Sequence, residues 1–163
     1  MKITKPLTST VVVGGLLALS LAGLTACSTG ATRDADTGEV TEAGQSDVFS
    51  VKVGDCFDDE GFSDPEVSEL PLIPCDRAHD NEIYHVFDLE DGDFPGVDEV
   101  ETLADEGCLA EFEGFIGLPF EESDVYYSYI YPTEDSWAMG DREIACLVFQ
   151  NDKTTGSLAG AAH

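Results

Sequence analysis

The clearest hydrophobic repeat in the chain lies between residues 97 and 115, where apolar side chains recur every three or four positions. This spacing places them on one side of a helix and predicts an amphipathic helix packed against a core. Asp98 and Glu99 stand in its first turn, where the helix dipole favours acids, and Gly117 ends it. The repeating positions are Val97, Val100, Ala104, Cys108, Phe112 and Phe115.

Shorter segments show the patterns of strands. Residues 144–149 are apolar at nearly every position, which predicts a central strand covered on both faces. Pro71 interrupts another apolar segment and favours an edge strand there, because proline has no N–H to donate. Thr133 is expected to cap a short helix that ends at Gly140. The predicted strands are residues 49–53, 70–73, 83–89, 125–131 and 144–149.

These elements predict a small α+β domain over residues 48–160, a mostly antiparallel sheet with one main helix and one short helix. The packed part is expected to end near Asn151, because residues 151–163 are small and polar and should be frayed. One sequence leaves several strand orders open.

The N-terminus has the pattern of an export signal. Lys2 and Lys5 precede an uncharged apolar stretch over residues 11–24, which is shorter than the roughly 20 residues that span a bilayer. Leu24-Thr25-Ala26-Cys27 resembles the lipobox of bacterial lipoproteins. We therefore expect residues 1–26 to be removed and the Cys27 thiol to carry a diacylglycerol, which would anchor the protein in the cell membrane. The alternatives are an uncleaved anchor or a secretory signal with an incidental cysteine.

Residues 28–47 contain no aromatic residue and a single valine, Val40. Such a composition does not build a core, so the segment is predicted to be a disordered tether with a mean span of roughly 25 Å.

The charge excludes several classes of partner. The chain has 34 acidic and 7 basic residues, for a net charge of −27. Without residues 1–26, the 34 acids face five bases, which gives −29. DNA, RNA and anionic lipid headgroups require clustered lysine and arginine, so none of them is expected to bind the folded part.

The four cysteines after Cys27 predict two disulfides, as is usual in an exported domain. Of three possible pairings we favour Cys56–Cys75 with Cys108–Cys146. The first would close the loop between two neighbouring strands, and the second would link the helix to the last strand. A zinc site is less favoured, because no pair has the close Cys-x-x-Cys spacing.

Candidate chemistry is sparse. Residues 91–96 begin like a calcium loop but lack two of its ligands, so a turn is expected. His79, Glu82 and His85 lie near other acids and could serve as metal ligands or as an acid–base pair. The favoured interpretation is that His79 and its acidic neighbours cap a turn beside a disulfide. No nucleophile motif or phosphate loop is present, so we expect neither catalysis nor a cofactor.

Two further features could bind a ligand. Arg142 is expected to form an ion pair with a nearby carboxylate of the protein. The alternative is that Arg142 binds a carboxylate group of a ligand. Trp137 and the tyrosines of residues 126–131 could line an aromatic groove for a peptide or glycan, although a role in the core is favoured. The candidate ligand-binding residues are thus His79, Glu82, Trp137 and Arg142.

Several motifs together resemble the septum formation-related domain of actinobacterial membrane proteins and lipoproteins, over residues 50–160. The resemblance implies an extracytoplasmic protein linked to septum formation, and it implies no catalytic residues. We therefore expect a non-catalytic binding module of the envelope whose partner is a protein, peptide or glycan. The alternatives are a metal-dependent hydrolase using His79 and His85, or a purely structural protein. The motifs are Val53-Gly54-Asp55-Cys56-Phe57, Pro74-Cys75-Asp76 with Ala78-His79-Asp80 and Glu82, Phe87-Asp88-Leu89, Phe94-Pro95-Gly96, Pro132-Thr133, Ser136-Trp137 with Gly140-Asp141-Arg142, Cys146-Leu147-Val148 and Thr155-Gly156-Ser157-Leu158.

Overall fold

The computed structural model describes residues 30–59 and 67–162. The predicted signal over residues 1–26 and the predicted lipid attachment at Cys27 lie outside the described residues, so both stay predictions. Within the described ranges, no helix combines the length and the apolar character that crossing a membrane requires.

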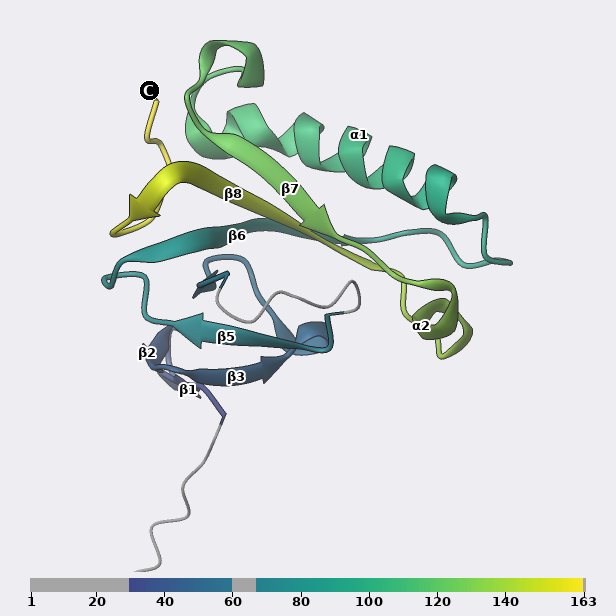
Figure 1. Ribbon diagram of the computed structural model, residues 1–163, viewed down its shortest axis with the longest axis horizontal. Coiled ribbons are helices and arrows are strands. Elements are labelled where there is room, and N and C mark those ends of the chain that lie inside the picture. The colour runs from purple at the N-terminus through teal and green to yellow at the C-terminus, as the bar shows by residue number, and fades with distance from the viewer. Residues whose placement is uncertain (1–29, 60–66, 163) are drawn as a thin grey trace, which may run out of the picture.

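A six-stranded antiparallel sheet forms the centre of the fold, in the order β3-β5-β4-β6-β8-β7 (Figure 1). Together with one long and one short α-helix, it confirms the predicted α+β class. The strands are β3 Gly44–Asp47, β4 Cys56–Phe57, β5 Glu69–Ile73, β6 His79–Asp88, β7 Tyr126–Ile130 and β8 Glu143–Thr154.

The long helix α1, Val97–Ile116, covers one face of the sheet and confirms the prediction from periodicity (Figure 1). Gly117 ends it in the left-handed conformation with φ 91°. Its buried stripe packs on Ile144, Cys146 and Val148 of β8, while Ala145 and Leu147 point into a second apolar cluster on the opposite face. The strand at 144–149 is therefore covered on both sides, as its composition predicts.

Both favoured disulfides are present. Cys56 and Cys75 join β4 to the end of β5, with Cα atoms 5.3 Å apart. Cys108 and Cys146 join α1 to β8, with Cα atoms 5.5 Å apart. The short helix α2, Glu134–Ala138, is also confirmed, with a capping box between Thr133 and Ser136.

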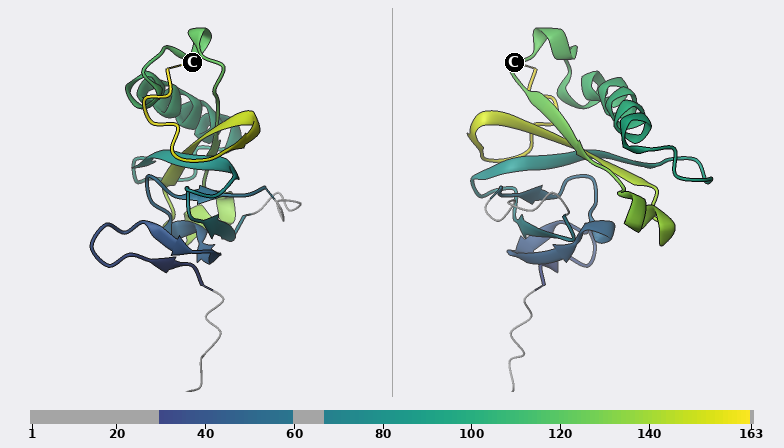
Figure 2. Two further views of the ribbon diagram at one scale, coloured as in Figure 1. Left: turned by 90° about the vertical axis from the view of Figure 1, so that its left-hand side faces the viewer. Right: turned by 45° about the vertical axis from the view of Figure 1, so that its right-hand side comes forward.

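The prediction of a disordered tether over residues 28–47 is wrong for residues 30–47. Strands β1, Thr32–Arg33, and β2, Val40–Glu42, form a hairpin at the end of the molecule opposite α1 (Figure 2). Strand β3 then pairs with β5, so the domain begins well before the predicted start at Val48. Backbone hydrogen bonds build this segment, and amino-acid composition does not report them.

The new strand changes the place of β5 in the sheet. Residues 70–73 were expected at an edge, but β3 pairs on one side of them and β4 on the other. Pro71 lies opposite Gln45 of β3, where the missing proline N–H removes one potential bond from the ladder.

The predicted strand at 49–53 is also wrong. Val48–Ser50 form a 3-10 turn, η1, whose first residues are capped by the Asp47 side chain accepting a hydrogen bond from Phe49 N. Phe49 and Val53 are 54% and 56% exposed, so the alternation there does not reflect a buried face. A local side-chain bond competes here with strand pairing.

The C-terminal segment is not frayed as expected. Strand β8 continues to Thr154, and the chain then folds back so that Leu158 is buried. Gly160 N and Ala162 N donate to the carbonyl oxygens of Phe115 and Ile116 at the end of α1. The described C-terminus thus belongs to the packed domain.

Candidate functional site

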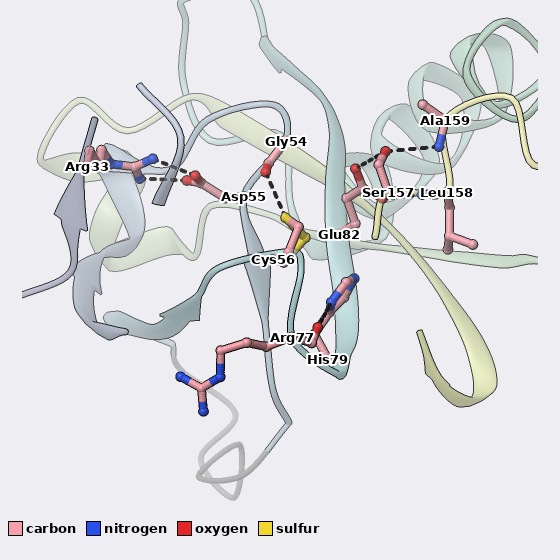
Figure 3. Close-up of a disulfide and its surroundings, with 11 residues drawn as sticks. Arg33, Gly54, Asp55, Cys56, Arg77, His79, Glu82, Ser157, Leu158 and Ala159 are labelled. Atoms are coloured by element: carbon pink, nitrogen blue, oxygen red, sulfur yellow. Dashed lines mark hydrogen bonds and ion pairs between the residues drawn. A yellow bond between two sulfur atoms is a disulfide. The ribbon is translucent and has the colours of Figure 1, made fainter. Parts of the chain in front are cut away.

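The predicted candidates His79 and Glu82 are buried side by side on β6, next to the Cys56–Cys75 disulfide (Figure 3). One potential ligand atom each of Cys56, His79 and Glu82 lies within 4.8 Å of the others. The tertiary structure therefore assembles a cluster of metal-ligand types that sequence spacing does not reveal.

Each member of this cluster already has a structural role. Glu82 accepts hydrogen bonds from Ser157 Oγ at 2.6 Å and from Leu158 N at 2.7 Å, so it anchors the C-terminal turn (Figure 3). His79 Nδ1 lies 2.8 Å from the Arg77 carbonyl oxygen, which can only accept, so this nitrogen carries the proton. The Cys56 sulfur is bonded to Cys75 and offers no thiolate to a metal.

His85 does not join the cluster. It lies six residues along the same strand from His79, about 20 Å at the usual rise per residue, and its ring packs beside Phe87 with centroids 5.6 Å apart. The structure therefore does not bring together the two histidines of the hydrolase hypothesis. His79 instead sits beside the turn in which Arg77 N donates to the Pro74 carbonyl, as the favoured interpretation predicts.

Arg142 pairs locally, as expected. Its guanidinium lies over the Trp137 ring at 3.8 Å, and its Nε is 3.4 Å from Asp91 Oδ1. Trp137 Nε1 donates to the Gly92 carbonyl at 2.9 Å, which ties the 91–96 turn to α2. Trp137 and Arg142 therefore connect α2 and the start of β8 to the 91–96 turn.

Tyr127 of β7 and Tyr131, which directly follows this strand, connect it to α1. Tyr127 and Tyr131 donate to Asp105 and Glu101 of α1, each at 2.8 Å. Burial and then the hydrogen bond to Asp105 raise the pKa of Tyr127 to about 12. These rings belong to the packing against α1, which agrees with the role in the core that the sequence favours.

A groove of about 610 Å³ lies on the sheet face opposite α1. Its floor is formed by Ala145, Leu147 and Phe149, the side chains of β8 that point away from α1, and β7 continues this surface. Further lining comes from η1, where Phe49 is 54% exposed, and from the end of α2, where the following residue Met139 is 80% exposed. Tyr129 and Tyr131, two tyrosines of the aromatic groove weighed from the sequence, line this site. Sequence reasoning missed the rest of its lining, which is spread from Val48 to Phe149. A usable signal was the continuous apolar run at 144–149, which gives β8 apolar side chains on the face away from α1 as well.

The charges around the groove have one sign. Among the described residues, the side chains lining it include four carboxylates and no lysine, arginine or histidine. Burial, and then the charges of Asp88 and Asp141, raise the pKa of Glu143 at the α2 end. The acids that line the groove are Asp59, Asp135, Asp141 and Glu143.

The architecture and the two disulfides can now be set beside known proteins. A family model described as Septum formation matches residues 20–146 and 93–161, which together make up most of the chain. This chain belongs to the septum formation family. The match begins before Val48, in agreement with the place of residues 30–47 in the sheet. Neither a curated protein nor a solved structure gives a significant match.

The disulfides bear on the compartment of the domain. The two described disulfides indicate an oxidising, extracytoplasmic environment, because cytosolic thiols are kept reduced. The predicted resemblance to the septum formation family is confirmed.

Proposed function

We propose that this member of the septum formation family is a lipid-anchored envelope protein, without catalytic activity, that binds a partner in the groove between η1, β8 and α2. The observation that carries the proposal is the groove itself. A groove of about 610 Å³ over apolar side chains, with Phe49 and Met139 exposed at its rim, is typical of a binding surface.

The anchor would hold the domain close to the bilayer. If Cys27 carries the lipid, only two residues lie between it and Gly30, the first described residue. Fully extended, the three residue steps from Cys27 to Gly30 reach about 10 Å, well short of the span of a 20-residue tether. The exposed acids of the β1–β2 hairpin, Asp34, Asp36, Glu39 and Glu42, would then face the headgroups, so the lipid rather than charge would provide attachment.

The chemistry of the buried cluster favours a binding role over hydrolysis. A metal hydrolase needs several protein ligands and an open position for water. Here the Cys56 sulfur is in a disulfide, Glu82 holds the C-terminal turn and His85 lies elsewhere on β6. The link to septum formation rests on the family description and would give the partner a place at the division site.

Site-specific photocrosslinking in living cells tests the binding role. A benzophenone amino acid at Phe49 or Met139 should give a discrete adduct with one envelope component, since both side chains are exposed at the groove. The matched control is Leu109 on α1, which is 38% exposed and lies on the other side of the sheet. Equal labelling at all three positions, or none at the groove, would contradict the proposal.

The anchor is tested separately. Metabolic labelling with radioactive palmitate should mark the wild-type protein and not Cys27→Ser, which should also be released from the membrane fraction. Labelling of the Cys27→Ser variant would disprove lipidation at this residue.

A further inference from the structure

We infer that the groove binds an extended basic polypeptide, which adds as a strand to the free edge of β7 and places its lysine or arginine side chains toward α2. This inference rests on the proposed binding function and names the chemistry of the partner.

Charge complementarity is the first support. Of the lining residues that the structure describes, four are carboxylates and none is basic, and Asp141 and Glu143 stand together at the α2 end. Like charges held this closely favour a cation between them, and a basic ligand would provide it. The raised pKa of Glu143 has the same cause, because burial and neighbouring carboxylates disfavour its charged form.

Two bases of the described chain, Arg142 and Lys153, are held by other groups. Arg142 directly precedes Glu143, but its guanidinium stacks on Trp137 and faces Asp91. Lys153 lies 2.6 Å from Asp58 and 3.2 Å from Asp80. The cation that the groove favours is therefore expected from a partner.

The floor has the repeat of an extended chain. Ala145, Leu147 and Phe149 alternate along β8, so successive side chains are about 7 Å apart. Every second side chain of a strand added beyond β7 has the same spacing, so apolar residues at those positions would extend this apolar surface past Ser128 and Ile130 of β7.

The edge of the sheet supplies main-chain partners. Strand β7 pairs with β8, and among the described strands no other pairs with it, so its second edge carries unpaired backbone groups. Residues 128–131 line the groove consecutively. A strand added to this edge would turn alternate side chains toward the face of Ser128 and Ile130, which is the groove face. Main-chain bonds of this kind bind a polypeptide rather than a glycan.

Fluorescence anisotropy with defined peptides tests the inference. The protein is the exported chain carrying Cys27→Ser, purified with its disulfides intact. The probes are alternating valine–threonine peptides that end in two lysines, two glutamines or two glutamates, together with the lysine peptide N-methylated at alternate amides. We expect the lysine peptide to bind at least about tenfold more tightly than the glutamine peptide, the glutamate peptide not to bind, and N-methylation to weaken binding at least about tenfold.

Paired charge variants provide the control. Asp135→Asn with Glu143→Gln should remove most of the preference for lysine, whereas Glu106→Gln with Glu113→Gln on the exposed side of α1 should leave it unchanged. Equal binding of the lysine and glutamate peptides would overturn the basic ligand, and full binding of the N-methylated peptide would overturn strand addition. If no peptide binds, the inference of a basic peptide ligand is wrong. The proposed binding function would still hold if the photocrosslinker at Met139 then formed an adduct with a glycan or an acidic protein.

Discussion

Replacing Arg33 by methionine should detach the N-terminal hairpin from the sheet, because this side chain joins β1 to a buried carboxylate. Arg33 Nη2 donates to Asp55 Oδ2 at 2.7 Å, and Nη1 donates to the other carboxylate oxygen and to the Gly38 carbonyl. The Asp55 side chain is 3% exposed, against 19% for Arg33. The variant would leave Asp55 with the hydrogen bond from Lys52 N at 2.8 Å and without its counter-ion.

The expected loss follows from this burial. Removing one partner of a fully buried ion pair costs about 3–5 kcal/mol, and a single hydrogen bond to a charged group contributes about 1.5–3 kcal/mol. Because water reaches the Arg33 side of the pair, we expect the free energy of unfolding to fall by about 2–3 kcal/mol. This corresponds to roughly a 30- to 150-fold increase in the unfolding equilibrium constant.

Urea unfolding of the oxidised protein measures the loss, and hydrogen exchange over residues 30–47 shows whether the hairpin opens first. Arg77→Met is the matched control, since Arg77 is exposed. Adding Asp55→Asn to Arg33→Met should recover part of the stability, because an amide is neutral. The reasoning is refuted if Arg33→Met leaves both the unfolding free energy and the exchange of residues 30–47 unchanged.

Three further outcomes are expected. Replacing Cys108 and Cys146 together by serine should lower the free energy of unfolding by about 4 kcal/mol, because the disulfide closes a loop of 38 residues and so limits the entropy of the unfolded chain. Urea unfolding of this variant and of the wild type measures the difference. Glu82→Gln should cost about 1–3 kcal/mol and raise amide exchange near Leu158, which donates to this carboxylate; unchanged exchange there would rule out its anchoring role. Burial and neighbouring acids raise the pKa of Glu143, so its ionisation destabilises the folded state as pH rises through that pKa. Glu143→Gln should therefore be more stable than the wild type at pH 7 and lose this advantage in acid, and a wild type that is more stable at pH 7 would contradict the sign.

Elements with a strong local pattern could be predicted from the sequence. The helix at 97–116 follows from its apolar spacing, and the covered strand at 144–149 follows from its continuous apolar run. The disulfides were favoured because one closes a local excursion and the other joins these two elements, and both are present.

The N-terminal segment could not be predicted, because its composition resembles that of a tether. Its order depends on backbone pairing with β5 and on the bond between Arg33 and Asp55, residues that are 22 positions apart. Phe49 was wrongly assigned to a strand for a related reason, since the Asp47 cap turns the chain before a strand can form.

The candidate site divides in the same way. The sequence identified His79 and Glu82 by residue type, but only the structure shows that Glu82 holds Ser157 and Leu158 across 75 and 76 positions. The sequence points to Tyr129 and Tyr131 as possible groove residues, but the rest of the lining cannot be predicted, since the groove brings η1 against β8 and α2.

The sequence by itself determined the export pattern at Cys27, the acidic character, the amphipathic helix and the central strand. Each of these features depends on residues that are close in sequence or on the amino-acid composition, so each can be recognised without knowing how the chain folds. The tertiary structure decided the place of residues 30–47, the edge position of β7 and the meeting of acids from Asp59 to Glu143 around one apolar floor. These features come from hydrogen bonds, burial and charge between distant segments, and such interactions exist only once the chain has folded.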